Sequence, residues 1–314
     1  MTFAGTTLLT ITIALQTVIG ITFNSCITAF SFRSRKNGSS FHPTNLIFSI
    51  MGLVNIFFQC VLTAQNIIFI LWPCLFSIKE LSLGLSVLTQ STAYCSFWLT
   101  GWLCAHYCVN IVNLGHHLIA RLQRLLSSFL PHVLVMSILG PILLGVLSIW
   151  MADDVFEVKP SSNHTGSSCI GGETFKLNAA YRVMTTFLGC CLPFFLALIS
   201  TGITISSLIR HINKMKNNIS GYTRSSLQSL IHAVKTMVLL LILSVIFYVF
   251  ALLFSATTTN TSVQVMSILS SLIIMSFPLT EAVIIIQAVP KLRKKIQGKL
   301  CCEKESDNKT EENN

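Results

Sequence analysis

Long apolar stretches alternate with short polar segments along this chain, and seven of the stretches are long enough to cross a membrane. A hydrocarbon core about 30 Å thick requires roughly 20 apolar residues per helix, and only helices and closed barrels satisfy their backbone groups inside it. The pattern therefore predicts an all-α, polytopic membrane protein built as a bundle of seven transmembrane helices. The predicted spans are Thr6–Phe30, Asn45–Leu71, Leu83–Asn113, Phe129–Trp150, Ala179–Arg210, Leu230–Phe254 and Ser262–Val289.

Composition supports this interpretation, since hydrophobic residues make up 52% of the 314 residues, charged residues make up 10%, and the mean hydropathy is +0.71. Such a chain lacks the polar residues that would cover a soluble domain. We expect one transmembrane domain over residues 1–300 and a disordered cytoplasmic tail over 301–314, because the tail is rich in Glu, Lys, Asp and Asn. Cys301 and Cys302 follow a basic segment and are either acylated or free thiols.

Lys and Arg are concentrated in alternate loops. Seventeen of the 21 lie in the first, third and fifth loops and in the tail, and four lie on the other side of the predicted membrane. Because cytoplasmic loops carry the excess of Lys and Arg, we expect an extracellular N-terminus and a cytoplasmic C-terminus, with the protein in the plasma membrane. The net charge of +10 then reflects topology and attraction to anionic membrane lipid, and we expect no nucleic-acid partner.

The longest predicted outer loop, from Met151 to Asn178, contains the sequon Asn163-His164-Thr165. A sequon on the luminal side during synthesis is a glycosylation acceptor, so we predict a glycan on Asn163. The same loop contains Cys169, which is placed to form a disulfide with Cys74 or Cys95, although it is also compatible with a free thiol.

The chain contains no HExxH or GxSxG pattern, no phosphate-binding loop and no Cys/His spacing typical of zinc. No pair of carboxylates within the spans suggests proton-coupled transport. We therefore expect no enzymatic activity, no cofactor and no metal site.

Several short motifs in the spans occur at characteristic spacings. In the fifth and sixth spans and the loop between them they are Leu192-Pro193-Phe194, Ser207-Leu208 with His211 and Met215, Gly221, and Ala233 with Lys235 and Thr236. In the third and seventh spans they are Trp98, Leu103, Tyr107, Ile111, Asn113, Pro278, Lys291 and Leu292. Together they resemble the type 2 (bitter) taste receptors, a family of G-protein-coupled receptors. The resemblance implies a seven-helix receptor with a small-molecule agonist and a heterotrimeric G protein as partners.

The chain also departs from the family pattern, so it resembles a divergent member. The departures, where the family has other residues, are Val54-Asn55, Asn110, Leu230 and Glu281-Ala282. Two alternatives remain open from the sequence. A vomeronasal type 1 pheromone receptor would share the seven spans, and a seven-span transporter or channel would be a different class of protein.

A ligand site in such a bundle is expected among the third, fifth, sixth and seventh spans, mostly apolar with a few polar anchors. The resemblance implies ligand contacts for Trp98 and Ser271. Trp102 lies one turn from Trp98 on the same face, and Ser267 lies one turn from Ser271. Arg182 is either an anchor for an anionic ligand or a side chain that reaches the lipid headgroups.

Glu281 is costly in the inner half of a span unless it is paired or hydrated, so it marks a functional position. We predict an internal polar switch in which Asn24, Asn55 and Asn110 are candidate partners of Glu281. The predicted G-protein contacts, which equally fit a role in topology alone, are His211, Lys214, Lys216, Arg224 and Lys235. The agonist itself is not determined by the sequence.

Overall fold

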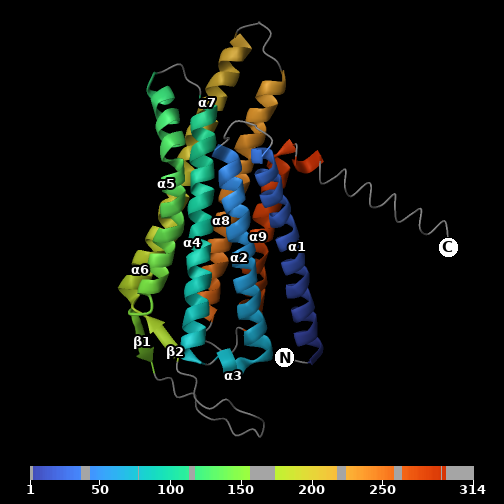
Figure 1. The fold of residues 1–314 in the computed structure, drawn as a ribbon, viewed down its shortest axis with the longest axis vertical. Coiled ribbons are helices and arrows are strands. Elements are labelled where there is room, and N and C mark those ends of the chain that lie inside the picture. The colour runs from blue at the N-terminus through green and yellow to red at the C-terminus, as the bar shows by residue number, and fades with distance from the viewer. Residues whose placement is uncertain are drawn as a thin grey trace, which may run out of the picture.

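The computed structural model describes residues 3–36, 43–76, 78–112, 117–155, 174–217, 224–257, 264–290 and 292–294. Within these ranges the chain forms a bundle of long helices (Figure 1). The helices are α1 (Phe3–Lys36), α2 (Pro43–Leu71), α3 (Pro73–Phe76), α4 (Lys79–Ile111), α5 (His117–Leu147), α6 (Ala179–Thr186), α7 (Leu192–Asn217), α8 (Arg224–Thr257) and α9 (Gln264–Ala288). A π-helical turn over Phe187–Cys191 joins α6 to α7, so the three elements form one span.

Six helices of the described chain are long and apolar enough to cross a membrane by length and composition. The seventh long helix, α4, is less apolar because it lies inside the bundle, where it packs against α2, α5, α7 and α8. Every residue from Ser91 to Phe97 is buried. In α1, by contrast, Leu8 is 67% exposed, as expected for a lipid-facing side chain. The arrangement confirms the predicted all-α membrane bundle.

The elements differ from the predicted spans at their ends and in one loop. α1 and α8 each continue beyond the predicted apolar stretch, because a helix extends into the polar region past the hydrocarbon core. The predicted outer loop contains two short strands, β1 (Ala152–Val155) and β2 (Thr174–Leu177), which pair antiparallel. Figure 1 shows this hairpin at the same end of the bundle as α3 and the start of α1.

Three of the predicted features of the loops and tail lie outside the described residues. They are the glycan site Asn163, the cysteines Cys169, Cys301 and Cys302, and the tail over 301–314. Cys74 is disulfide-bonded, while the other seven described cysteines are free. The predicted alternative of a Cys95 disulfide is wrong, because Cys95 is buried as a free thiol whose Sγ lies 3.7 Å from the Ile138 carbonyl.

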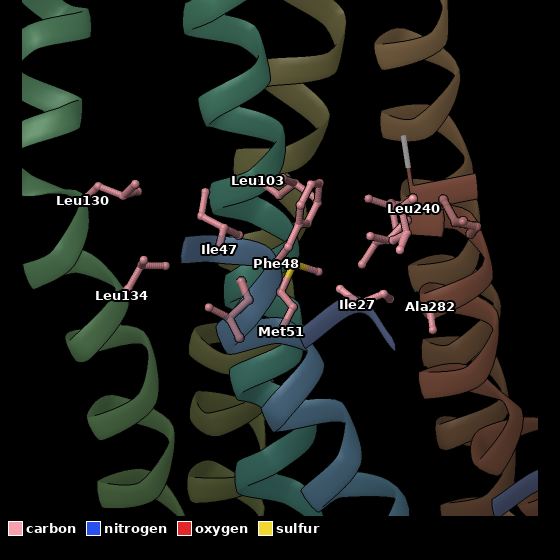
Figure 2. Close-up of a cluster of buried hydrophobic side chains, with 13 residues drawn as sticks. Ile27, Ile47, Phe48, Met51, Leu103, Leu130, Leu134, Leu240 and Ala282 are labelled. Carbon is pink, nitrogen blue, oxygen red and sulfur yellow. The ribbon is translucent and has the colours of Figure 1, made fainter. Parts of the chain in front are cut away.

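A large apolar core fills the half of the bundle away from the hairpin. Figure 2 shows that its side chains come from several helices, including Ile47, Phe48 and Met51 of α2 and Leu103 of α4. Small residues let these helices approach closely. A Cβ on Gly52 of α2 would lie 3.0 Å from the backbone oxygen of Asn24 in α1.

Candidate functional site

The long axis of the bundle has two distinct ends. We name the end that holds β1, β2 and α3 the hairpin end, and the end where α9 finishes the tail end (Figure 1). Buried or half-buried polar and aromatic side chains form three successive layers between them.

The first layer, which we call the hairpin-end polar layer, consists of hydrogen-bonded side chains from α2, α4 and α9. The Thr89 hydroxyl donates to Oε1 of Gln65 across 2.7 Å. The Ser271 hydroxyl donates to Oδ1 of Asn66 across 2.6 Å. All four side chains are half-buried, so they keep partial access to their surroundings. The layer includes Ser271, which the sequence singled out.

A third bond extends this layer along α4. The Gln90 amide donates to the Tyr94 hydroxyl across 2.7 Å, and Tyr94 packs against Gly189 of the π-helical turn. None of the six side chains in the layer carries a charge. Sequence reasoning missed five of these residues, although Gln65-Asn66 and Thr89-Gln90 are adjacent polar pairs close to span ends and could have been noticed.

The second layer is aromatic and follows the first toward the tail end. Phe58 of α2, Phe97 of α4, Phe247 of α8 and Phe277 of α9 are buried, with ring centroids from 4.6 Å apart for Phe247 and Phe277 to 6.5 Å for Phe58 and Phe277. Pairs at such separations and tilted angles are favourable beyond the burial of their area. The four rings therefore couple the positions of four helices.

The third layer is centred on Glu281, whose side chain is completely buried. Its Oε1 accepts a hydrogen bond from the Thr100 hydroxyl at 2.6 Å. Its Oε2 accepts bonds from the Asn55 amide at 2.7 Å and from the Ser96 hydroxyl at 3.0 Å. A buried carboxyl without donors would be strongly destabilising, and three neutral donors on two other helices satisfy this one.

Asn24 joins the same cluster from α1. The Asn55 amide also lies 3.3 Å from Oδ1 of Asn24. The Asn24 amide donates to the Gly20 carbonyl at 2.9 Å and to the Pro278 carbonyl at 3.2 Å. We name the set Asn24, Asn55, Ser96, Thr100 and Glu281 the Glu281 cluster. It connects α1, α2, α4 and α9, and among the described residues no Lys, Arg or His is bonded to it.

Asn110 does not belong to the Glu281 cluster, contrary to the prediction. Asn110 is exposed, and its amide lies 2.9 Å from Nε2 of His106. The same His106 nitrogen lies 3.0 Å from the Thr44 hydroxyl. The physical reason is depth, because ten residues of helix separate Asn110 from Thr100 and span about 15 Å. Asn110 therefore lies at the tail end.

Trp98 and Trp102 stack on each other with ring centroids 6.3 Å apart and 21° between the ring planes. Their side of α4 is defined by two neighbours: Cys95 contacts Ile138 of α5, and Gly101 packs against Pro193 of α7. Helical periodicity places both tryptophans between these two contacts. The pair therefore lies on a different side of α4 from the Glu281 cluster, and Trp98 follows Tyr94 of the hairpin-end polar layer by one helical turn.

The remaining predicted site residues are spread over both ends. Arg182 is exposed on α6. Ser267 belongs to α9, one turn before Ser271, and its side chain lies outside the described part of the chain. The predicted coupling residues lie at the tail end of α7 (His211, Lys214, Lys216) and in the first turns of α8 (Arg224, Lys235), where Lys235 is exposed.

Comparison with known proteins decides between the receptor and transporter alternatives. The family model of the taste receptor protein (TAS2R) matches residues 1–304. The chain is 24% identical over 281 residues to taste receptor type 2 member 40 of Gallus gallus, covering 88% of this chain and 89% of that protein. It is 23% identical over 288 residues to taste receptor type 2 member 9 of Homo sapiens, covering 90% of each. The low identities agree with a divergent member.

These matches extend over the transmembrane bundle and over all three layers. They confirm the predicted receptor class, and they show a membrane receptor rather than an enzyme. The chain belongs to the taste receptor protein (TAS2R) family, the type 2 taste receptors.

Proposed function

We propose that this receptor binds small, uncharged, bitter extracellular molecules at the hairpin-end polar layer and then activates a heterotrimeric G protein at the tail end. The observation that carries the proposal is the succession of three layers. Half-buried neutral donors and acceptors face one end, and they are connected through Phe97 and Phe277 to a buried polar cluster. Charged ligands are disfavoured because the layer offers no opposite charge.

The orientation follows from the distribution of charge. Seventeen of the 21 Lys and Arg residues belong to the first, third and fifth loops and the tail, and those that the structure describes lie at the tail end. We therefore infer that this end faces the cytoplasm and the hairpin end faces outward. In this orientation the loop that carries the hairpin is extracellular. A glycan on Asn163 would then be removable by a glycosidase, with a shift in electrophoretic mobility. The same orientation is the basis for proposing a plasma-membrane location.

A change in helix packing at the ligand site would reach the Glu281 cluster through α4 and α9, where residues of the aromatic layer lie within about one turn of residues of the cluster. Phe277 lies one turn from Glu281 on α9, and Phe97 lies three residues from Thr100 on α4. A ligand that contacts α2, α4 and α9 more favourably in one arrangement shifts the population toward it. Because the same helices carry the donors to Glu281, rearrangement of the aromatic layer would change those bonds. We therefore propose that Asn24, Asn55 and Glu281 form the switch.

The proposed docking surface for the G protein is the tail end of α7 and the beginning of α8. Lys235 is exposed there, and His211, Lys214, Lys216 and Arg224 belong to the same helical segments. Basic residues at this end would attract an acidic partner and anionic lipid alike. Charge reversal at Lys235 should lower coupling without lowering surface expression if the contact is with the G protein.

The decisive experiment expresses the chain with and without a taste-type G protein and screens bitter compounds by calcium imaging. The expected result is a response to a set of uncharged compounds that disappears when the G protein is omitted. Replacing Asn66 with Leu should weaken that response, whereas Phe195→Leu on the exposed face of α7 should not. Flux of a compound across the membrane without a G protein would contradict the proposal.

A further inference from the structure

Gln59 of α2 carries a buried amide that the three layers do not use. Its side chain is completely buried, and neither Nε2 nor Oε1 has a hydrogen-bond partner among the described residues. An amide that is removed from water without a replacement partner is destabilising. Native structures satisfy nearly all such groups with protein atoms or with an ordered water molecule.

The position of Gln59 is defined by the contacts on either side of it. Toward the hairpin end, the Thr17 and Thr63 hydroxyls of α1 and α2 lie 2.7 Å apart. Toward the tail end, the Asn55 amide lies 3.3 Å from Oδ1 of Asn24. Gln59 therefore lies between two polar contacts that join the same pair of helices.

The residue opposite Gln59 on α1 is Gly20. A Cβ there would lie 3.2 Å from Oε1 of Gln59, so the amide reaches the backbone of α1 where a larger side chain would crowd it. The Gly20 carbonyl already accepts the helical backbone bond and the Asn24 side-chain amide, so it leaves the Gln59 amide without a partner there. One turn away on α1, Oε1 of Gln16 is also buried and without a partner among the described residues.

We propose that an ordered water molecule is bound between α1 and α2 at Gln59, bridging its amide to polar atoms of α1 that include Gln16. Three unpartnered side-chain atoms from two helices supply the two to four partners that a buried water requires. The bound water holds α1 against α2 one turn from Asn24 and Asn55. Gln59 is thus a positioning residue for the Glu281 cluster, because it acts on Asn24 through the backbone of α1.

The first test replaces Gln59 with Met, which keeps the length of the side chain and removes its polar atoms. If water is bound, Gln59→Met lowers the Tm of the purified receptor by about 2–6 °C, the shift expected for losing one or two buried hydrogen bonds. If no water is bound to the Gln59 amide, the Tm of Gln59→Met rises or stays unchanged, and the proposal is overturned. The control is Gln287→Met, since Gln287 is exposed on α9.

The second test separates bridging water from a direct bond between the two glutamines. With water, Gln59→Met still lowers the Tm when Gln16 is already Met, because in that background the water still bonds to the Gln59 amide. A direct bond predicts no further decrease in that background, and this result would overturn the proposal. A change in basal calcium signalling of Gln59→Met, with Gln287→Met unchanged, supports the positioning role.

A direct measurement does not depend on any variant folding. An experimental structure of the unmodified receptor, at a resolution that shows ordered water, should contain water density within about 3.2 Å of the Gln59 amide. An amide that bonds only to protein atoms would overturn the proposal.

Discussion

The Thr100 hydroxyl of α4 donates to Oε1 of Glu281 in α9 across 2.6 Å, where the Glu281 side chain is completely buried. This contact joins the most buried helix of the bundle to the last one. Bonds from Asn55 and Ser96 to the other carboxyl oxygen add α2 to the connection. The cluster is therefore a place where a change in helix packing must break or remake buried hydrogen bonds, because a buried polar group that loses its partner is costly.

Replacing Glu281 with Gln should impair both folding stability and signalling. The amide nitrogen of Gln donates and does not accept. The Thr100 hydroxyl would therefore have to turn and accept from it, or the Asn55 amide would lose its acceptor. We expect a loss of about 1–3 kcal/mol in the free energy of unfolding. The measurement is thermal unfolding of the purified receptor together with calcium responses at matched surface expression. A Glu281→Gln variant that folds and signals like the unmodified receptor would contradict the proposed switch.

Replacing Thr100 with Val isolates one donor at nearly constant shape. The hydroxyl of Thr100 bonds to a buried carboxyl oxygen, and leaving that oxygen without this donor costs about 1–3 kcal/mol. Thr92 is a matched control on the same helix, since it is also buried but its hydroxyl bonds only to the Leu88 and Thr89 carbonyls. Thr100→Val should lower the Tm and shift the concentration–response curve, and Thr92→Val should do neither. Equal effects of the two variants would mean that Thr100 contributes through general packing and not through its bond to Glu281.

Much of the architecture could be predicted from the sequence because lipid imposes simple rules. Span length and the scarcity of charges located the helices, and the cost of burying Glu281 indicated that it needs polar partners. Asn24 and Asn55 were proposed as partners by the same reasoning, and the structure brings both to Glu281. Ser96 and Thr100 gave no signal, because Ser and Thr in a helix commonly bond to their own backbone.

The remaining features depend on which helices are neighbours, and one sequence does not contain that information. Asn110 was wrongly named as a partner, since the sequence does not show which level of α4 faces Glu281 of α9. Trp98 and Trp102 stay predicted ligand contacts, and their side of α4 is known only from the contacts of Cys95 and Gly101 with α5 and α7. The hairpin was missed because its two strands are short and far apart in the chain.

Gly52 should not tolerate even a methyl group. A Cβ at this position would overlap the Thr28 side chain and lie 3.0 Å from the backbone oxygen of Asn24. The backbone of α1 cannot turn aside as a side chain can, so Gly52→Ala should push α1 away from α2. We expect the free energy of unfolding to fall by about 1–3 kcal/mol. Gly84→Ala is the control, because a Cβ there meets no atom within 4 Å and Ala favours helix. Thermal unfolding should show a lower Tm for the first variant and an equal or higher Tm for the second.

The aromatic layer should be required for signalling more than for ligand binding. Phe277 packs 4.6 Å from Phe247, centroid to centroid, and lies one turn from Glu281. Phe277→Leu keeps an apolar side chain and removes the ring contacts, which contribute about 0.5–1.5 kcal/mol per pair. We expect a reduced maximal calcium response with a smaller change in agonist affinity. Phe195→Leu on the exposed face of α7 serves as the control. An equal effect of both variants on the calcium response would contradict a role of the aromatic layer in signalling.

The bond between Ser271 and Asn66 gives the sharpest test of where the agonist lies. Removing the Ser271 hydroxyl takes one neutral donor from the hairpin-end polar layer, and a net contribution of about 0.5–1.5 kcal/mol corresponds to about a 2–10-fold increase in the agonist concentration for half-maximal response. Ser276→Ala is the control on the same helix, since the Ser276 hydroxyl bonds only to the Ile273 carbonyl. An unchanged response in Ser271→Ala, Asn66→Leu and Thr89→Val alike, at equal surface expression, would move the agonist site away from this layer and leave membership in the receptor family untouched.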